Sequence, residues 1–153
     1  MQNEKKIDIL LTALGERYGA LRAIRERVQT VGLAVIGLLF AGGGWIIQSG
    51  KQFTCPEKLL ASFGLLAAIA VLRLSFLANL QQGFRKQQQV TARIEKALGL
   101  YSPNAFDGVD EPIYPEEWSS AGEAGGPGAF FGTTYLLLYT GTIFLLVTLF
   151  LVS

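Results

Sequence analysis

Residues 59–80 have the sequence LLASFGLLAAIAVLRLSFLANL, and this stretch decides the fold class. It contains twenty-two residues, of which Arg73 is the only charged one, and it has no proline. A run of about eighteen or more apolar residues is typical of a transmembrane helix, because such a helix crosses the hydrocarbon core and satisfies its own backbone hydrogen bonds there. The stretch therefore predicts a membrane-spanning helix.

Two further apolar stretches predict spans before and after it. Residues 31–47 (VGLAVIGLLFAGGGWII) carry no charge and cover about 25 Å at ~1.5 Å per residue, and residues 130–152 (FFGTTYLLLYTGTIFLLVTLFLV) also carry none. About thirty residues of charged, helical sequence precede the first stretch, and residues 41–45 make a poor cleavage site, so we interpret it as a retained helix and not a signal peptide. The predicted fold class is an all-α membrane protein with three transmembrane helices.

The segments between the spans predict how the helices are connected. Residues 48–57 are too few to hold a domain, so the first two spans are expected to form an antiparallel hairpin. Residues 4–28 have an amphipathic pattern that runs into the first span without a proline, and residues 81–100 have a weaker helical pattern. We therefore predict three parts: a long helical hairpin over residues 1–100, a loop over 101–129 and the third span over 130–153.

The positions of Lys and Arg predict the orientation. Ten of them flank the spans on the side of residues 4–27 and 85–96, against two in the hairpin turn, Lys51 and Lys58. Positive residues near span ends favour the cytoplasmic side. We expect a multi-pass protein of the cell (inner) membrane with a cytoplasmic N-terminus and an external C-terminus. The single cysteine, Cys55, would then face outward.

The composition argues against several classes of function. Half of the residues are apolar, 16% are charged, the mean hydropathy is +0.37 and the net charge is +1. The sequence has no basic patch of the kind that would indicate nucleic-acid binding. The absence of histidine and the single cysteine argue against most zinc, haem and thiol–imidazole chemistry, and no phosphate-binding or hydrolase motif occurs. We expect no cofactor, no metal and no catalytic centre.

The loop of residues 101–129 combines four prolines, several glycines and six acidic residues with no Lys or Arg. A calcium site is a weak alternative, because the spacing of Asp107, Asp110 and Glu111 does not match an EF-hand loop. Tyr114 and Trp118 are apolar residues set between prolines and acids. We expect these two side chains to dock on the cytoplasmic helices or on a partner.

Arg73 is the sharpest single feature, because a charge inside a span is costly and often functional. It lies seven residues before Leu80, roughly 10 Å from the presumed cytoplasmic boundary. The favoured interpretation is that its long side chain reaches up to the membrane surface, which is called snorkelling. The alternative is that Arg73 lines a cavity between helices and attracts an anion or a partner's carboxylate.

Small residues form two candidate packing stripes, which suit close helix contacts. The stripes are Gly37 and Ala41 in the first span, and Ala61, Gly64, Ala68 and Ser75 in the second. We expect one stripe to pack within the hairpin and the other to meet another chain. The third span is rich in hydroxyl groups, which are expected to bond to carbonyls of their own helix, the alternative being a polar seam or a pore lining.

These observations favour a non-enzymatic membrane scaffold, or an accessory subunit of a larger membrane assembly. The expected partners are the lipid bilayer and either further copies of the chain or a larger membrane complex, with no nucleic acid. The alternative function is a homo-oligomeric channel or membrane-permeabilising effector gated by the cytoplasmic helices. In that case Arg73 or the hydroxyl face of the third span should line the pore.

Overall fold

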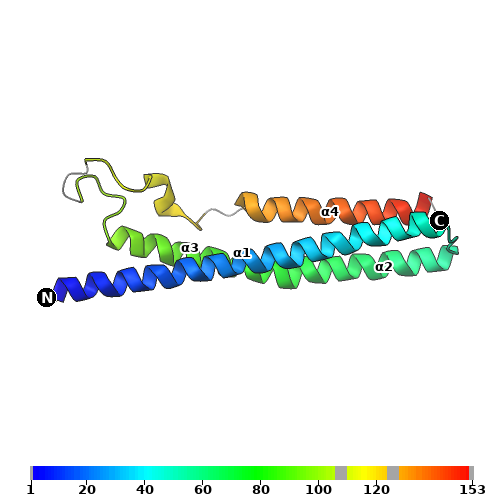
Figure 1. The fold of residues 1–153 in the computed structure, drawn as a ribbon, viewed down its shortest axis with the longest axis horizontal. Helices are drawn as coiled ribbons and strands as arrows, with labels where there is room; N and C mark the ends of the chain where they lie inside the picture. The colour runs from blue at the N-terminus through cyan, green and yellow to red at the C-terminus, as the bar shows by residue number, and fades with distance from the viewer. Residues whose placement is uncertain (1, 106–109, 124–127, 152–153) are drawn as a thin grey trace. The chain divides into compact units, whose positions relative to one another are not determined.

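A computed structural model describes residues 2–105, 110–123 and 128–151, and within these ranges the chain is helical with no strand (Figure 1). The elements are α1 (Gln2–Ser49), α2 (Cys55–Val71), the π-helix η1 (Leu72–Leu77), α3 (Ala78–Ala97), the 3-10 helix η2 (Glu116–Ser120) and α4 (Gly128–Leu151). Three stretches, Glu4–Ser49, Cys55–Ala97 and Gly128–Leu151, are long and apolar enough to cross a membrane. The predicted all-helical fold with three such helices is confirmed to this extent.

The helices run without interruption through the junctions between polar and apolar segments. α1 continues without a break from the amphipathic segment into the first apolar stretch, and α2, η1 and α3 follow one another directly. α2 begins at Cys55, directly after its N-cap residue Thr54, and Pro56 lies in its first turn. The Glu57 carboxylate accepts hydrogen bonds from the Thr54 N–H (2.8 Å) and hydroxyl (2.9 Å). The π-helical turn at η1 was not predicted from the sequence.

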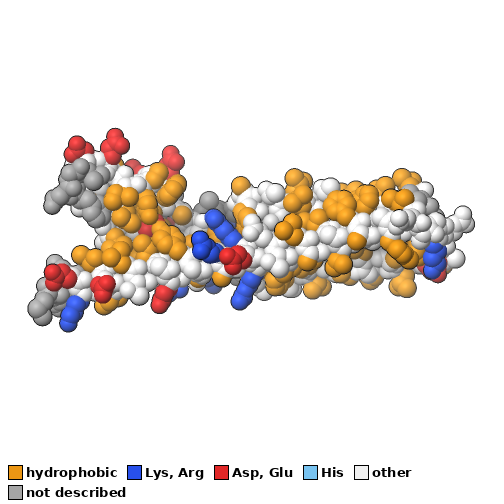
Figure 2. Space-filling model, viewed as in Figure 1, with side chains coloured by type: hydrophobic (Ala, Val, Ile, Leu, Met, Phe, Trp, Pro, Cys, Tyr) orange, Lys and Arg blue, Asp and Glu red, His pale blue; other side chains and the backbone are white. Residues whose placement is uncertain are grey.

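The chain divides into two compact units. We call Met1–Arg25 with Leu80–Gly126 the polar unit, and Glu26–Asn79 with Pro127–Ser153 the apolar unit. The apolar unit holds the second half of α1, all of α2 and η1, and α4, and these helices lie side by side (Figure 1). On the face of this unit that Figure 2 shows, the coloured side chains are mostly orange apolar ones, set among white atoms.

Within the apolar unit, α1 and α4 run parallel and approach closely at glycines. Leu39 lies against Gly141, and the ring of Phe40 lies 5.1 Å from that of Phe144. A Cβ atom on Gly43 would lie 2.4 Å from the ring of Phe144, far inside van der Waals contact. The ring therefore occupies the space that only a glycine leaves open.

α2 runs antiparallel to α4 in the same unit. At one end the Lys58 ammonium lies 6.0 Å from the ring centre of Phe150, and at the other the Arg73 guanidinium lies over Tyr135 and Tyr139. Since residue numbers rise on α2 as they fall on α4, the end of η1 and the start of α4 lie at the same end of the apolar unit.

Within the polar unit, the first half of α1 packs antiparallel to α3. Arg17 donates a hydrogen bond to Gln87 (3.1 Å), while Arg25, further along α1, lies over the ring of Phe84, which is earlier on α3. The buried side chains along these helices are Leu14, Phe84, Thr91, Ala92 and Glu95. The loop after α3 returns to that helix at Gly122, whose carbonyl accepts a hydrogen bond from the Gln89 amide (3.0 Å).

Gly43 and Gly44 give a matched test of the α1–α4 contact. Gly43→Ala places a methyl group against the Phe144 ring, whereas Gly44→Ala meets nothing within 4 Å. Both changes alter helix propensity alike, so we expect Gly43→Ala to be less stable than Gly44→Ala by about 1–3 kcal/mol, the usual cost of overpacking. The free energy of unfolding in mixed micelles measures the difference, and equal stabilities would contradict the close contact.

Gly122 tests the attachment of the loop to α3. It has a φ of +85°, and a Cβ there would lie 2.7 Å from the Arg85 carbonyl oxygen. Gly122→Ala therefore adds a clash to backbone strain, and we expect faster amide hydrogen exchange over residues 114–123. Gly50→Ala is the control, because Gly50 also has a positive φ (+57°) but open space around it. Unchanged exchange in Gly122→Ala would show that this contact does not hold the loop.

Candidate functional site

The polar unit is organised around the buried carboxylate of Glu95 on α3, which is only 7% exposed. One carboxylate oxygen accepts a hydrogen bond of 2.5 Å from the Tyr18 hydroxyl on α1. The other accepts a hydrogen bond from the Tyr101 hydroxyl, which follows α3. A buried carboxylate is costly unless it is hydrogen-bonded, so these two phenols are what make its position tenable.

An aromatic chain extends from this carboxylate into the loop. The ring of Tyr101 lies 6.0 Å from that of Tyr114, which in turn lies 5.7 Å from that of Trp118. The Tyr114 N–H also donates to the Leu100 carbonyl (3.0 Å). The structure thus brings Tyr114 and Trp118, the two residues singled out in the sequence, together beside Glu95. Tyr114 is half-buried, and Trp118 remains 56% exposed.

Burial of their hydroxyl groups, and then the hydrogen bonds to Glu95, raise the pKa of Tyr18 and the pKa of Tyr101 above the ordinary tyrosine value. Both phenols therefore stay protonated and donate to the carboxylate throughout the neutral range. A cavity of about 350 Å³ adjoins the cluster, with Arg25, Glu95 and Trp118 in its lining. Because both carboxylate oxygens already accept a phenol, the arrangement suits an anchor better than a general base.

Glu95 was missed by the sequence analysis, although a signal for it exists. It lies four residues after Thr91 and eleven after Phe84, on the same buried face of α3. A lone acid on the apolar side of a helical pattern needs hydrogen-bond donors, and one of the two tyrosines that supply them, Tyr18, lies far away in the sequence. Asp107 of the acidic loop lies outside the described residues, while Asp110 and Glu111 are exposed.

In the apolar unit, Arg73 lies in η1 with its side chain exposed. Its guanidinium carbon is 5.4 Å from the ring centre of Tyr135 and 5.6 Å from that of Tyr139, both on α4. These are cation–π distances, and two rings at once fix the head group more firmly than one. The sequence analysis found Arg73 but not its tyrosine partners.

The two small-residue stripes lie on the surface of the apolar unit. Gly37, Ala41, Gly64, Ala68 and Ser75 are all exposed, and a Cβ on Gly37 or Gly64 would meet nothing within 4 Å. The close contacts within the unit are made by other glycines instead: Gly32, Gly42, Gly43 and Gly141. Ala68 and Ser75 line an apolar groove of about 610 Å³, together with Val31 of α1.

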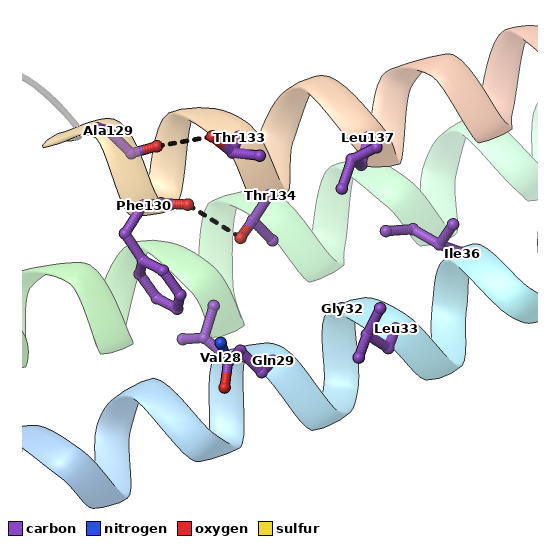
Figure 3. A pocket seen from close by; sticks show the side chains of 10 residues that line it. All are labelled: Val28, Gln29, Gly32, Leu33, Ile36, Ala129, Phe130, Thr133, Thr134 and Leu137. Carbon is purple, nitrogen blue, oxygen red and sulfur yellow. Dashed lines mark hydrogen bonds between the residues drawn. The ribbon is translucent and has the colours of Figure 1, made fainter.

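A second groove of about 470 Å³ lies between α1 and the start of α4 (Figure 3). Thr133 and Thr134 line it, but their hydroxyls donate to the carbonyls of Ala129 (3.0 Å) and Phe130 (3.1 Å) in their own helix. Further along α4, Thr140, Thr142 and Thr148 each donate to the carbonyl four residues earlier. The expected back-bonding of the third-span hydroxyls is confirmed for these five threonines.

Comparisons with protein-family models, with curated proteins and with solved structures each find no match to this chain.

The Glu95 cluster predicts a loss of stability at alkaline pH. A raised pKa in the folded state means that the hydrogen bonds stabilise the fold fully below about pH 10, the unfolded tyrosine pKa, and less as the pH rises beyond it. Tyr101→Phe should remove part of this dependence and lower stability at pH 7 by about 1–2 kcal/mol. Tyrosine absorbance and unfolding measured between pH 8 and about 12 check this. An unaltered pH profile in Tyr101→Phe would argue against the cluster, and Tyr139→Phe is the control outside it.

Proposed function

We propose that this chain is an integral membrane protein that crosses the bilayer three times and acts as a non-enzymatic scaffold or accessory subunit of a membrane assembly. The observation that carries the proposal is the exposure of α2. Only 6% of the most apolar stretch in Cys55–Ala97 is buried, and Leu60 and Phe63 are each 75% exposed. Burying one such side chain is worth about 1.5–3 kcal/mol, so a row of them in water would be strongly unfavourable.

Lipid, or the helices of other membrane proteins, would cover this surface. The antiparallel order of α2 against α1 and α4 then allows the polar segments before residue 26, after residue 79 and before residue 128 to leave the membrane on one side. By the distribution of Lys and Arg, that side is the cytoplasm, which places the N-terminus inside and the C-terminus outside. The membrane we propose is the cell (inner) membrane, and the long helical hairpin would extend from it into the cytoplasm.

The scaffold interpretation is supported by what the exposed surfaces offer. The small-residue stripe of α2 and the grooves beside it permit close approach by another helix. In the polar unit, Trp118 presents an indole at the rim of a cavity, a common form of protein contact. The alternative, a homo-oligomeric channel, draws less support, because the hydroxyls of Thr133, Thr134, Thr140, Thr142 and Thr148 are already bonded to their own helix.

Cys55 is a natural label site for a test of the topology, because it is exposed and is the only cysteine in the sequence. A membrane-impermeant maleimide should label Cys55 in intact cells. In the Cys55→Ser background, Ser120→Cys should be labelled only after the membrane is permeabilised. The protein should also stay in the pellet after a carbonate wash. Release by carbonate, or labelling of both sites in intact cells, would overturn the proposed insertion.

A liposome experiment separates the scaffold from the channel. The purified protein, reconstituted alone, should leave the ion permeability of liposomes unchanged if it is a scaffold. Gentle purification from native membranes should then yield a larger complex of fixed stoichiometry. Ion conductance by the protein alone, reduced in an Arg73→Gln variant, would favour the channel instead.

A further inference from the structure

We propose that Arg73 is the docking point for a carboxylate that a partner protein carries inside the membrane, on a transmembrane helix of its own. This inference rests on the proposed insertion of the apolar unit in a bilayer, and it names the kind of partner that the scaffold would hold. It depends on three features of Arg73: its depth, its unmet charge and its accessibility.

The guanidinium lies over two rings of α4 within the apolar unit. Its carbon lies at nearly equal distances from the rings of Tyr135 (5.4 Å) and Tyr139 (5.6 Å). These tyrosines follow Phe130, where the third apolar stretch begins, by five and nine residues, while Arg73 precedes Leu80 by seven. At ~1.5 Å per residue, both measures place the charge roughly 10 Å below the boundary.

The general direction of helical side chains is relevant to this position. Side chains on a helix lean toward its N-terminus, and the N-terminus of α2, at Cys55, is the end remote from Leu80. To reach the boundary near Leu80, Arg73 would have to extend against this lean and leave both rings. In the structure the guanidinium contacts the two rings of α4, and the snorkelling interpretation, which concerns its position in a bilayer, stays a prediction.

No acidic residue of the chain meets this charge inside the spans, because residues 31–47, 59–80 and 130–152 contain neither Asp nor Glu. Tyrosine rings attract a cation, but they do not replace the paired oxygens of a carboxylate, which match the planar fork of arginine N–H donors. A second copy of this chain brings no intramembrane carboxylate either. An intramembrane carboxylate that pairs with Arg73 would therefore come from a different protein.

The site is open to such a helix. Arg73 is exposed on the least buried of the three apolar helices, and its neighbour Leu74 is 69% exposed. The surrounding π-helix η1 has the Ala78 N–H donating to the Arg73 carbonyl, and π-helical turns are frequent at functional sites. The two tyrosines hold the guanidinium at a fixed height, so a partner helix would meet it with little further loss of side-chain entropy.

A synthetic single-span helix tests the proposal directly. The probe is a Leu/Ala helix with one Glu seven residues from its cytoplasmic end, and its control carries Gln at that position. Both are mixed with the full chain in liposomes, and association is followed by energy transfer from a dye on Cys55. The Glu helix should bind more tightly than the Gln helix on the order of tenfold, as interhelical polar contacts in membranes permit.

Arg73→Gln should abolish this preference, and Arg73→Glu should reverse it toward a helix that carries Lys. Lys58→Gln is the matched control, because it removes the other cation–π contact between α2 and α4 and should leave the preference intact. Equal binding of the Glu and Gln helices by the natural chain would overturn the proposal. So would a Glu preference that survives in Arg73→Gln.

A lipid headgroup is the other source of an anion, and native mass spectrometry separates it from a helix. Anionic lipid retained by the natural chain and lost in Arg73→Gln, without a preference for the Glu helix, would assign Arg73 to lipid phosphate and overturn the proposal. The carbonate wash distinguishes a failure of this inference from a failure of the proposed membrane insertion. A chain that stays in the pellet but shows no Glu preference contradicts only this inference, whereas release by carbonate contradicts the insertion itself.

Discussion

The close approach of α1 and α4 at Gly43 and Gly141 is the contact on which the apolar unit depends. Without side chains at these two positions, Phe144 and Leu39 fill the space between the helices. This contact sets α4 parallel to α1, and α2 is left to run the other way. Tyr135 and Tyr139 then come to the height of Arg73, so the environment of the one charge in the three apolar stretches of the sequence follows from a packing contact of other residues of α4.

In the polar unit, hydrogen bonds take the place of a close glycine contact in holding the helices together. Of the large apolar residues on its helices, only Leu14 and Phe84 are buried, and the group at its centre is the Glu95 carboxylate. Because Tyr18 belongs to α1 and Tyr101 follows α3, satisfying one buried acid joins two segments that lie far apart in the sequence. The loop is then added through ring contacts of Tyr114 and a backbone approach at Gly122, both of which need a specific geometry and not merely apolar surface.

The helices could be predicted from the sequence because their signals are local. Length, hydropathy and the absence of proline fix residues 31–47, 59–80 and 130–152 within a few positions, and the amphipathic pattern of 4–28 fixes the continuation of α1. The pairing of residues could not be predicted in this way. In the sequence, Gly43 is one of three successive glycines, and the stripe at Gly37 and Ala41 has equally suitable spacing for a helix contact. Only the contact with Phe144 shows that Gly43, and not Gly37, lies where α1 meets α4. Likewise, the partners of Arg73 and Glu95 lie more than sixty residues away in sequence, apart from Tyr101.

The exposed apolar surface of α2 makes it the helix through which the chain would contact other molecules. Within the apolar unit, α1 and α4 use their glycines and aromatic rings on each other, and the most apolar stretch of α4 is 28% buried against 6% for that of α2. Lipid alone could cover the apolar side chains of α2, because hydrocarbon and leucine are alike in polarity. Lipid tails, however, provide neither a hydrogen-bond acceptor nor a negative charge for a guanidinium. If α2 lies in a bilayer, an apolar residue at position 73 would serve an anchor better, since an Arg costs up to about 2.5–3.5 kcal/mol to insert at the centre of a membrane helix. Under the proposed insertion, a bound anion accounts for Arg73 between two tyrosines better than anchoring does.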